Sequence, residues 1–426
     1  MTNIIPKNWK ECSLQDFTEI IMGQSPPSNT YNSDKKGLPF FQGKAEFGKL
    51  YPTPIKYCSK PKKIAEEGDI LLSVRAPVGS TNINKYKSCI GRGLAAIRPV
   101  AGIQSKYILY VLRTNEQKLN ALGTGTTFKA ISKKTLHEFK CCMPPLDEQN
   151  RIVEKTEELF SSLDKATDDL KKIQGQLKTY RQSVLKAAFE GKYVNEFKYK
   201  MMKLGDFERK GGGTPSTKKE EYWNGNINWI TSANIDGNNK IHFEKKITEI
   251  GLDNSSTNIV PKDSVIVVTR VGLGKVAVNQ EATAFSQDIQ GIVCRELNPY
   301  FLMWQIKSVA NEIISKGQGT TINGITVNKL NEIEIKIPTK NIQNIIVKEI
   351  ESRLSVCDKL EETVEQSLKK NEYLRQSILK QAFEGKLVPQ DSNDEPVQFI
   401  IEKVNQEKLS NTIYKKKYDS IQTRLV

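Results

Sequence analysis

The 426-residue sequence has little histidine and no long apolar run, and both absences limit what the protein can be. It contains two histidines, His137 and His242, so histidine-based catalysis has little material to work with. The longest apolar stretches, such as Val265–Val268, are strand-sized and far below the ~18–20 residues that cross a bilayer. A charged-then-apolar signal segment is also missing at the start. These absences predict a cytoplasmic protein without a membrane span.

Motifs that bind metals or nucleotides are equally scarce. The seven cysteines form no Cys-x-x-Cys pair, and Cys141 and Cys142 are adjacent, so we expect neither a disulfide framework nor a metal site. Gly272-Leu-Gly-Lys275 lacks the upstream glycine of a phosphate-binding loop. Met143-Pro-Pro-Leu146 lacks the asparagine and the aromatic residue of the adenine methyltransferase motif, and it fits a helix breaker. We therefore predict that the chain is not an enzyme and holds no cofactor of its own.

Positive charge is abundant, and its distribution is uneven. Lys and Arg total 64 against 49 for Asp and Glu, a formal net charge of +15. Residues 1–146 carry a net +12 and residues 196–340 a net +3, whereas residues 147–195 and 341–426 are each neutral. Two basic segments therefore alternate with two neutral ones. Nucleic acid and an anionic membrane surface are the partners that this charge favours.

The chain contains an internal duplication. Residues 181–192 and 375–386 are identical at ten of twelve positions, with an offset of 194. The same offset pairs the loop 123–127 with the loop 317–321. This period is far too long for a solenoid repeat, so we predict two copies of one module, each with a globular part and a helical part.

The neutral segments have the pattern of long helices. Apolar residues recur every 3.5 positions on average, which is typical of a coiled-coil seam. The polar Asn371 inside the second seam is typical of a position that fixes register or partner. Gly191 and Gly385 fit C-terminal caps, and about 44 residues would form a rod of roughly 65 Å. The expected seam residues are Leu163, Leu170, Ile173, Leu177, Leu360, Val364, Asn371, Leu374 and Ile378.

The basic segments show short β-type runs between turn residues, with helices expected over Lys106–Leu119 and Pro299–Ile314. We predict an α+β fold with two similar globular domains, each followed by a long helix. The two helices are expected to pack as an antiparallel coiled coil with pseudo-two-fold symmetry. The predicted parts are the domains 1–146 and 196–340, the helices 147–195 and 341–386, and a partly helical tail, 387–426.

Loop residues provide the candidate contacts to nucleic acid. Gly23-Gln-Ser-Pro26 and Gly212-Gly-Thr-Pro-Ser216 hold equivalent positions, where glycine would admit a phosphate close to the backbone, although plain turn chemistry explains them equally well. Trp223 and Trp229 fit a hydrophobic core better than a stacking platform. The candidate residues are Gln24, Ser25, Lys44, Arg75, Arg92, Thr127, Lys129, Thr214, Ser216, Ser232, Arg270, Lys275, Gln287 and Thr321.

Two of the candidate arginines each directly follow a segment that is predicted to be a buried strand. Arg75 and Arg270 could bind guanine bidentately or hold a phosphate, or each could pair with an acid inside its own domain. A nearby turn differs between the copies: it is Gly91-Arg-Gly93 in the first and Gln287-Asp-Ile289 in the second. Gln and Asp favour adenine and cytosine edges, whereas Arg favours guanine or phosphate.

These features together resemble the specificity subunit of type I restriction–modification systems. The resemblance rests on the duplicated domain-then-helix order and on the paired Leu-Lys-x-Ala-Phe-Glu-Gly-Lys helix ends. It also rests on Gly212-Gly-Thr-Pro-Ser216, followed by Tyr222-Trp-Asn-Gly225 and Trp229-Ile-Thr-Ser232. It covers residues up to about 390, and the tail departs from the pattern.

The resemblance implies a non-catalytic subunit in which each domain recognises one half of a split, asymmetric DNA sequence. It further implies that the helices act as a spacer and that modification subunits, two in number, dock on helices and domains. S-adenosylmethionine, ATP and Mg²⁺ would then belong to the modification and restriction subunits. The rival hypothesis from the residues is a coiled-coil scaffold whose basic domains bind RNA or an anionic membrane.

Overall fold

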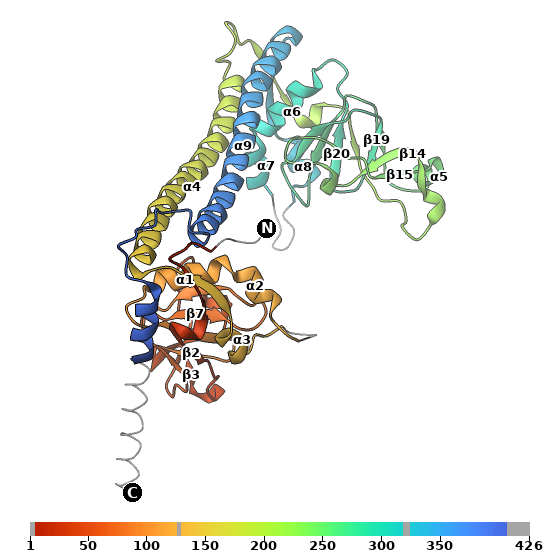
Figure 1. Ribbon diagram of the computed structural model, residues 1–426. Coiled ribbons are helices and arrows are strands. Elements are labelled where there is room, and N and C mark those ends of the chain that lie inside the picture. Colours follow the sequence, from red (N-terminus) through yellow and green to blue (C-terminus); the bar gives the residue numbers. More distant parts are fainter. Residues whose placement is uncertain (1–4, 126–128, 318–323, 407–426) are drawn as a thin grey trace. The chain divides into compact units, whose positions relative to one another are not determined.

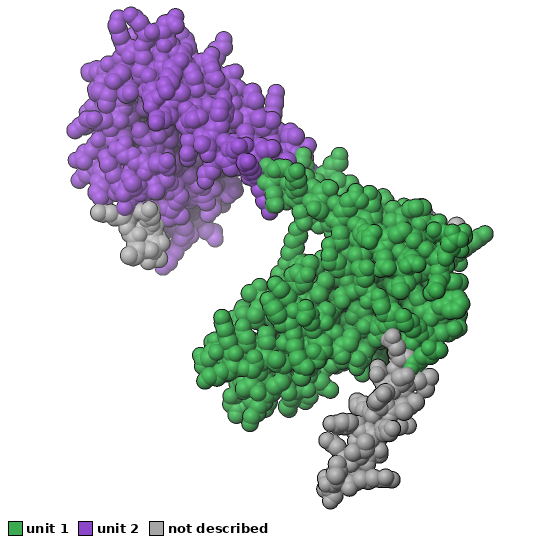
Figure 2. Space-filling model, turned by 90° about the vertical axis from the view of Figure 1, so that its left-hand side faces the viewer, with its two compact units in different colours: residues 1–169, 367–426 green, residues 170–366 purple. Residues whose placement is uncertain are grey.

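The computed structural model describes residues 5–125, 129–317 and 324–406. The chain divides into two compact units, residues 1–169 with 367–426 and residues 170–366 (Figure 2). Each unit combines one α+β domain with a part of both long helices. The division into units therefore cuts across the two helices, whereas the predicted parts separate helices from domains.

In the described part of the first unit, the α+β domain has three sheets and three short helices, and the tail adds a further helix at residues 397–406 (Figure 1). The sheets have the strand orders β1-β11, β2-β10-β7-β8 and β3-β5-β4-β9-β6. The strands are β1 Lys10–Ser13, β2 Thr18–Met22, β3 Tyr31–Asn32, β4 Leu38–Phe41, β5 Lys56–Cys58, β6 Ile64–Ala65, β7 Ile70–Ser73, β8 Thr81–Ile83, β9 Ser88–Ile90, β10 Leu94–Pro99 and β11 Lys140–Met143. The helices are α1 Ser105–Thr114, α2 Glu116–Ala121 and α3 Lys133–His137, with 3-10 turns η1 Leu14–Asp16, η2 Ser28–Thr30 and η3 Lys44–Glu46.

The second unit repeats this arrangement, with strand orders β12-β21, β13-β20-β17-β18 and β15-β14-β19-β16. The strands are β12 Tyr199–Lys203, β13 Arg209–Gly211, β14 Trp223–Ile230, β15 Lys245–Ile247, β16 Ile259–Val260, β17 Val265–Val268, β18 Val276–Val278, β19 Thr283–Phe285, β20 Ile289–Ile292 and β21 Glu334–Pro338. The helices are α5 Glu249–Asp253, α6 Pro299–Ser308, α7 Ala310–Ser315 and α8 Val327–Asn331, with 3-10 turns η4 Leu204–Asp206, η5 Glu220–Tyr222 and η6 Ser232–Asn234.

The central sheets are built around one fully buried strand each. All four residues of β7 and all four of β17 are buried, and each strand lies between two antiparallel neighbours. Parallel pairing of β4 with β9, and of β14 with β19, recurs in the second sheet of each unit. The duplication inferred from sequence is thus a duplication of topology.

The helices expected over Lys106–Leu119 and Pro299–Ile314 are each broken in two. The breaks fall at Asn115 and Val309, which have nearly the same backbone angles. At the first break the side-chain amide of Asn115 donates to the Val111 carbonyl at 2.8 Å and so competes with the helical backbone hydrogen bonds. The prediction of one continuous helix in each place is wrong.

The two long helices are α4 Leu146–Phe189 and α9 Lys340–Phe383, each of 44 residues. They pack together, and the pairing inside each unit is antiparallel. In the first unit Asn371 donates to Thr167 at 3.3 Å, and in the second Arg181 donates to Glu361 at 2.9–3.0 Å. The polar seam residue Asn371 therefore has a polar partner on the opposite helix.

The buried seam is narrower than the predicted one. In α9 the buried positions Ile350, Cys357 and Val364 recur every seven residues, and Leu177 and Val184 do so in α4. By contrast, the predicted seam residues Ile173, Leu360 and Leu374 are 39%, 47% and 39% exposed. Of the rest, Leu177 and Val364 are buried, and four are half-buried, namely Leu163, Leu170, Asn371 and Ile378. Away from the helix ends, the buried residues thus follow one heptad position, and the second position has the exposed Ile173, Leu360 and Leu374.

Each long helix ends at its predicted glycine cap. Gly191 and Gly385 have φ values of +82° and +69°, a conformation that side chains disfavour. The amide of Lys192 donates to the Ala187 carbonyl at 3.0 Å, which closes a Schellman-type end. The helices end before the predicted limits of residues 195 and 386 because the chain reverses at these caps.

The tail packs against the first domain. Arg151 donates twice to Asp394, at 3.0 and 2.6 Å, and the Asp394 side chain is only 6% exposed. Residues 397–406 are helical, in agreement with the prediction of a partly helical tail. The side chains of Val397, Ile400 and Val404 are buried in the core of the first domain. The three consecutive lysines Lys415, Lys416 and Lys417 near the end of the tail lie outside the described residues.

Candidate nucleic-acid interface

Three predicted cations of the first domain line one cavity of about 530 Å³. Lys44 lies on η3, Arg75 follows β7, and Arg92 lies in the turn between β9 and β10. All three side chains are exposed, and among the described residues none has an ion-pair or side-chain hydrogen-bond partner. An exposed concavity with three uncompensated positive charges suits an anionic ligand.

Backbone contacts bring the other predicted residues of this domain to the same place. The Arg92 amide donates to the Ser25 hydroxyl at 3.2 Å, and the Gln24 amide donates to the Ile90 carbonyl at 3.0 Å. The Ala76 amide donates to the Lys129 carbonyl at 3.0 Å. The described candidates of the first domain therefore converge at one end of its sheets, whereas Thr127 lies outside the described residues.

Sequence reasoning missed the acid of this cavity, Glu46, as well as the polar lining residues Gln42 and Ser73. The contacts of Glu46 explain its place. Its carboxylate accepts a hydrogen bond from the Gly43 amide at 3.3 Å, so it caps the η3 turn on which Lys44 lies. The signal was available, because an acid three residues after a turn-forming glycine is typical of such a cap. One carboxylate against three cations leaves the cavity positive.

The equivalent place in the second domain is largely neutralised. Arg270 forms an ion pair with Asp288 at 3.0 Å, so the alternative of an acid inside the same domain holds for this arginine. Thr214 donates to Gln287 at 2.6 Å, and both side chains are exposed. Asp288, which we considered as a base contact, is thus engaged by its own domain.

The difference between the two arginines comes from one position. In the first domain the Val74 backbone amide donates to the Gly93 carbonyl. In the second domain the Thr269 backbone amide donates to the Asp288 carbonyl, so Gly93 and Asp288 hold equivalent positions. A side chain at Gly93 would have its Cβ 2.3 Å from the Gln42 carbonyl oxygen. Arg75 therefore faces a glycine where Arg270 faces the carboxylate of Asp288.

Lys275 and Ser232 have structural roles. The Lys275 ammonium donates to the carbonyls of Ser232 and Ile235, at 3.2 and 2.8 Å, and holds the η6 turn against the start of β18. Ser232 is buried, with 5% of its surface exposed. Lys275 is half-buried. Ser216 is exposed, and Thr321 lies outside the described residues.

The loop glycines are needed by the protein's own packing. A Cβ at Gly23 would lie 2.2 Å from the Gly91 carbonyl oxygen, and one at Gly212 would lie 2.0 Å from that of Ser286. The indole N–H groups of Trp223 and Trp229 donate to carbonyls of this second loop, both at 3.1 Å. Trp229 is buried and Trp223 packs beside it edge to face, so the prediction of a core role for the tryptophans is confirmed.

The residues that the structure describes contain no group of three or more His, Cys, Asp or Glu side chains able to hold a metal ion. The seven cysteines are free thiols. Among the helices that the structure describes, none is both long and apolar enough to cross a bilayer.

The two copies of one α+β domain, each with its loop cluster, and the two long helices define a duplicated two-domain protein. The family model described as "Type I restriction modification DNA specificity domain" matches residues 6–178 and again residues 197–370. The chain belongs to this family. Both copies of the duplicated module are covered by the match.

Individual relatives agree with the family. The chain is 42% identical, over 195 residues, to a putative type I restriction enzyme specificity subunit of Methanocaldococcus jannaschii, a match that covers 44% of each protein. It is 23% identical, over 422 residues, to the EcoDI specificity subunit of Escherichia coli, covering 92% of this chain and 91% of that protein. A chain from a type I restriction–modification assembly has the same fold, with a TM-score of 0.75 at 17% identity, and covers 90% of this chain and 99% of that one.

Proposed function

We propose that this chain recognises DNA sequence for a type I restriction–modification complex, and that each domain contacts one half of a split target. The observation that carries the proposal is the repeated loop cluster with different chemistry in each copy. The first copy holds unpaired Lys44, Arg75 and Arg92, whereas the second holds the Arg270–Asp288 pair beside Gln287. Two copies that differ in this way suit two different half-sites, which makes the target asymmetric.

We assign no chemical step to this chain. The S-adenosylmethionine, ATP and Mg²⁺ of the complex belong, in this proposal, to two modification subunits and to restriction subunits in the cytoplasm. The open heptad face of the long helices, which includes Ile173, Leu360 and Leu374, supports docking of other subunits there. Family membership favours DNA over the rival scaffold that binds RNA or membrane.

Methylation mapping of the host genome, with and without this chain, tests the proposal directly. We expect methylated adenines at one split, asymmetric sequence, and we expect them to disappear when the chain is removed. Exchange of residues 10–143 for the equivalent domain of a relative should change one half of that sequence and leave the other half intact. Unchanged methylation after removal of the chain would refute the proposal.

A further inference from the structure

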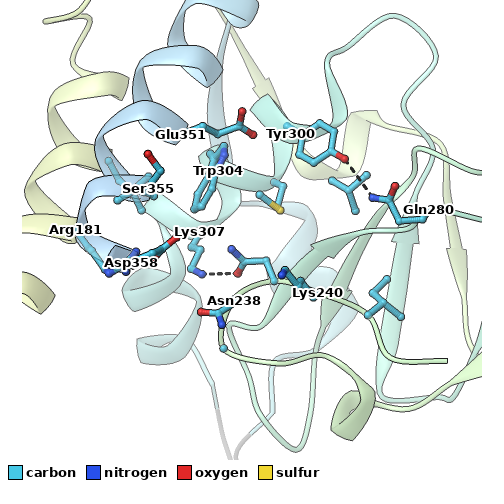
Figure 3. A pocket seen from close by; sticks show the side chains of 17 residues that line it. Arg181, Asn238, Lys240, Gln280, Tyr300, Trp304, Lys307, Glu351, Ser355 and Asp358 are labelled. Carbon is cyan, nitrogen blue, oxygen red and sulfur yellow. Dashed lines mark hydrogen bonds and ion pairs between the residues drawn. The ribbon is translucent and has the colours of Figure 1, made fainter. Parts of the chain in front are cut away.

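The second unit contains a cavity of about 610 Å³ that is separate from the loop cluster (Figure 3). It lies between the second domain and the parts of α4 and α9 that belong to this unit. Apolar side chains such as Leu185, Met303 and Leu354 form much of its wall, together with the rings of Tyr300 and Trp304. This volume is in the range of pockets that hold small ligands or single side chains.

The internal duplication supplies a control for this cavity. With the offset of 194, α6 is equivalent to α1, and the start of α9 is equivalent to the start of α4. Glu351 is therefore equivalent to Glu157, and Arg181 is equivalent to Arg375. The corresponding position in the first unit shows how the same framework satisfies its polar groups.

In the first unit this position is filled and its charges are paired. Glu157 accepts hydrogen bonds from the Lys106 ammonium and the Tyr110 hydroxyl. Phe160 packs edge to face on Tyr110, with ring centres 5.6 Å apart. The Arg375 guanidinium lies over the Phe160 ring at 4.8 Å and pairs with Asp164. The carboxylate therefore has a cation, a hydroxyl donor and an aromatic cover from its own unit.

In the second unit three replacements remove those partners. Tyr300 stands in place of Lys106, Trp304 in place of Tyr110, and the smaller Leu354 in place of Phe160. The Tyr300 hydroxyl is engaged by Gln280 at 3.2 Å. Within the residues that the structure describes, Glu351 has no hydrogen bond or ion pair, and the buried Trp304 Nε1 has no acceptor. Glu351 is an exposed residue at the edge of the cavity, and desolvation by its surroundings raises the pKa of its carboxyl.

The other charged groups of the cavity are engaged or lie at its far side. Arg181 pairs with Asp358 and Glu361, and Lys307 donates to Asn239. The exposed Lys240 also lines the cavity and lies on the Lys307 side of Trp304 (Figure 3). Figure 3 shows Trp304 between Glu351 and Lys307, so the carboxylate and the lysine occupy opposite sides of the indole. A cationic ligand would consequently be attracted to the Glu351 side and repelled from the Lys307 side.

We propose that this cavity binds a ligand that presents an ammonium or guanidinium group to Glu351 and lays an apolar stem along Trp304 and Leu354. The ligand would replace the cation that Lys106 supplies in the first unit. Aromatic walls assist such binding because the face of an indole or phenol ring attracts cations. The inference is independent of DNA recognition, since neither Glu351 nor Tyr300 belongs to the loop cluster.

Calorimetric titration of the full chain with n-butylguanidinium tests the proposal, and isosteric, uncharged n-butylurea serves as the matched ligand. We expect saturable binding of n-butylguanidinium at least about tenfold tighter than that of n-butylurea, as a charge-assisted hydrogen bond provides. Glu351→Gln should abolish this preference, and Tyr300→Lys, which restores the internal cation of the first unit, should do the same. The exposed Glu365→Gln on the same helix should retain it.

Equal binding of the two probes to the original chain would overturn the proposal, as would an undiminished preference in Glu351→Gln. A thermal melt of each variant confirms that the fold is intact. Spermidine and N-acetylarginine amide then distinguish the source of the cation. Tighter binding of spermidine indicates a free polyamine, and tighter binding of the arginine amide indicates a side chain of a docked protein. Binding of neither, with n-butylguanidinium also inactive, contradicts the proposal.

Discussion

Arg75 and Arg270 hold the same position in two copies of one domain, and their surroundings give them different chemistry. Arg270 is held by Asp288, which fixes the guanidinium and cancels its charge. Arg75 has no acid at that place because Gly93 occupies it, and Arg92 and Lys44 add to its positive field. At the residue scale, therefore, Gly93 in place of Asp288 and Arg92 in place of Gln287 separate a strongly positive site from a nearly neutral one.

The matched substitutions Arg75→Ala and Arg270→Ala should have different effects on binding of a cognate duplex. Arg75→Ala should weaken the binding free energy by about 1–3 kcal/mol and lower the salt dependence of the binding constant, because an uncompensated charge is removed. Loss of Arg270 should lower the salt dependence less, since Asp288 already offsets its charge. Fluorescence anisotropy at several salt concentrations measures both quantities. Equal salt slopes for the two variants would contradict the assignment.

A pH experiment tests the paired and unpaired glutamates of the helix junctions. Burial raises the pKa of Glu157, but the hydrogen bonds from Lys106 and Tyr110 outweigh it and place the pKa below the usual 4.5. The stability that this carboxylate contributes is present above about pH 4.5 and is lost as the pH falls through its lowered pKa. The decrease in the free energy of unfolding that Glu157→Gln causes should therefore become smaller as the pH falls.

Glu351→Gln is the matched control for this prediction. The pKa of Glu351 is raised by burial, so its ionised form opposes folding and that penalty disappears as the pH falls. The effect of Glu351→Gln on the free energy of unfolding should therefore not show the loss of a stabilising contribution on acidification that is expected for Glu157→Gln. Denaturant unfolding at several pH values measures both variants. A Glu157→Gln cost that grows below pH 4.5 would contradict the argument.

At the element scale, the long helices depend on their ends and on one buried stripe. Each helix stops at a glycine with positive φ, and a Schellman-type hydrogen bond closes the turn. Between the helices, one heptad position of each is buried and the other is open. The open position explains why the apolar pattern in the sequence is wider than the contact between the helices.

Gly175 inside α4 and Gly191 just after its end should respond in opposite directions to alanine. Gly191→Ala should destabilise the chain by about 1 kcal/mol or more, because the left-handed backbone disfavours a side chain. Its Cβ would also lie 2.5 Å from the Phe197 Cβ. Gly175→Ala should stabilise by about 0.5–1 kcal/mol, because this residue is inside the helix and a Cβ there meets no atom within 4 Å. Urea unfolding curves measure the free energy of unfolding of both variants. A change of the same sign in both would contradict the role of Gly191 as a helix cap.

At the scale of the whole molecule, each compact unit is assembled from distant parts of the chain. The first unit needs the end of α9 and the tail, and the second needs the end of α4. The tail supplies Val397, Ile400 and Val404 to the core of the first domain and is anchored by the Arg151–Asp394 pair. The last described segment is therefore a structural part of the first domain.

Truncation after residue 390 should destabilise the first domain selectively. Burial of each of the three aliphatic side chains contributes about 1.5–3 kcal/mol at most, so the loss should be several kcal/mol. Hydrogen exchange should accelerate in β2, β7 and β10 and stay unchanged in β17 and β20. Truncation after residue 406 keeps the buried side chains and is the control. Equal acceleration in both sheets would contradict this assignment.

The sequence by itself determined the duplication, the two long helices, their glycine caps and the alternation of basic and neutral segments. These features are local or periodic, so residue spacing reports them directly. The sequence also pointed to the strand-end arginines, because a charged residue immediately after a buried strand is visible in the pattern. Family membership confirms the resemblance that the repeated motifs indicated.

Only the tertiary structure decided which of these charges are free. Asp288 neutralises Arg270 and Lys275 is used by η6, whereas Arg75 and Arg92 line an open cavity. The same holds for the helix junctions, where Glu157 is paired and Glu351 is not. Such partners come from segments far apart in the chain, and their pairing depends on distances of a few ångströms that spacing along a sequence does not encode.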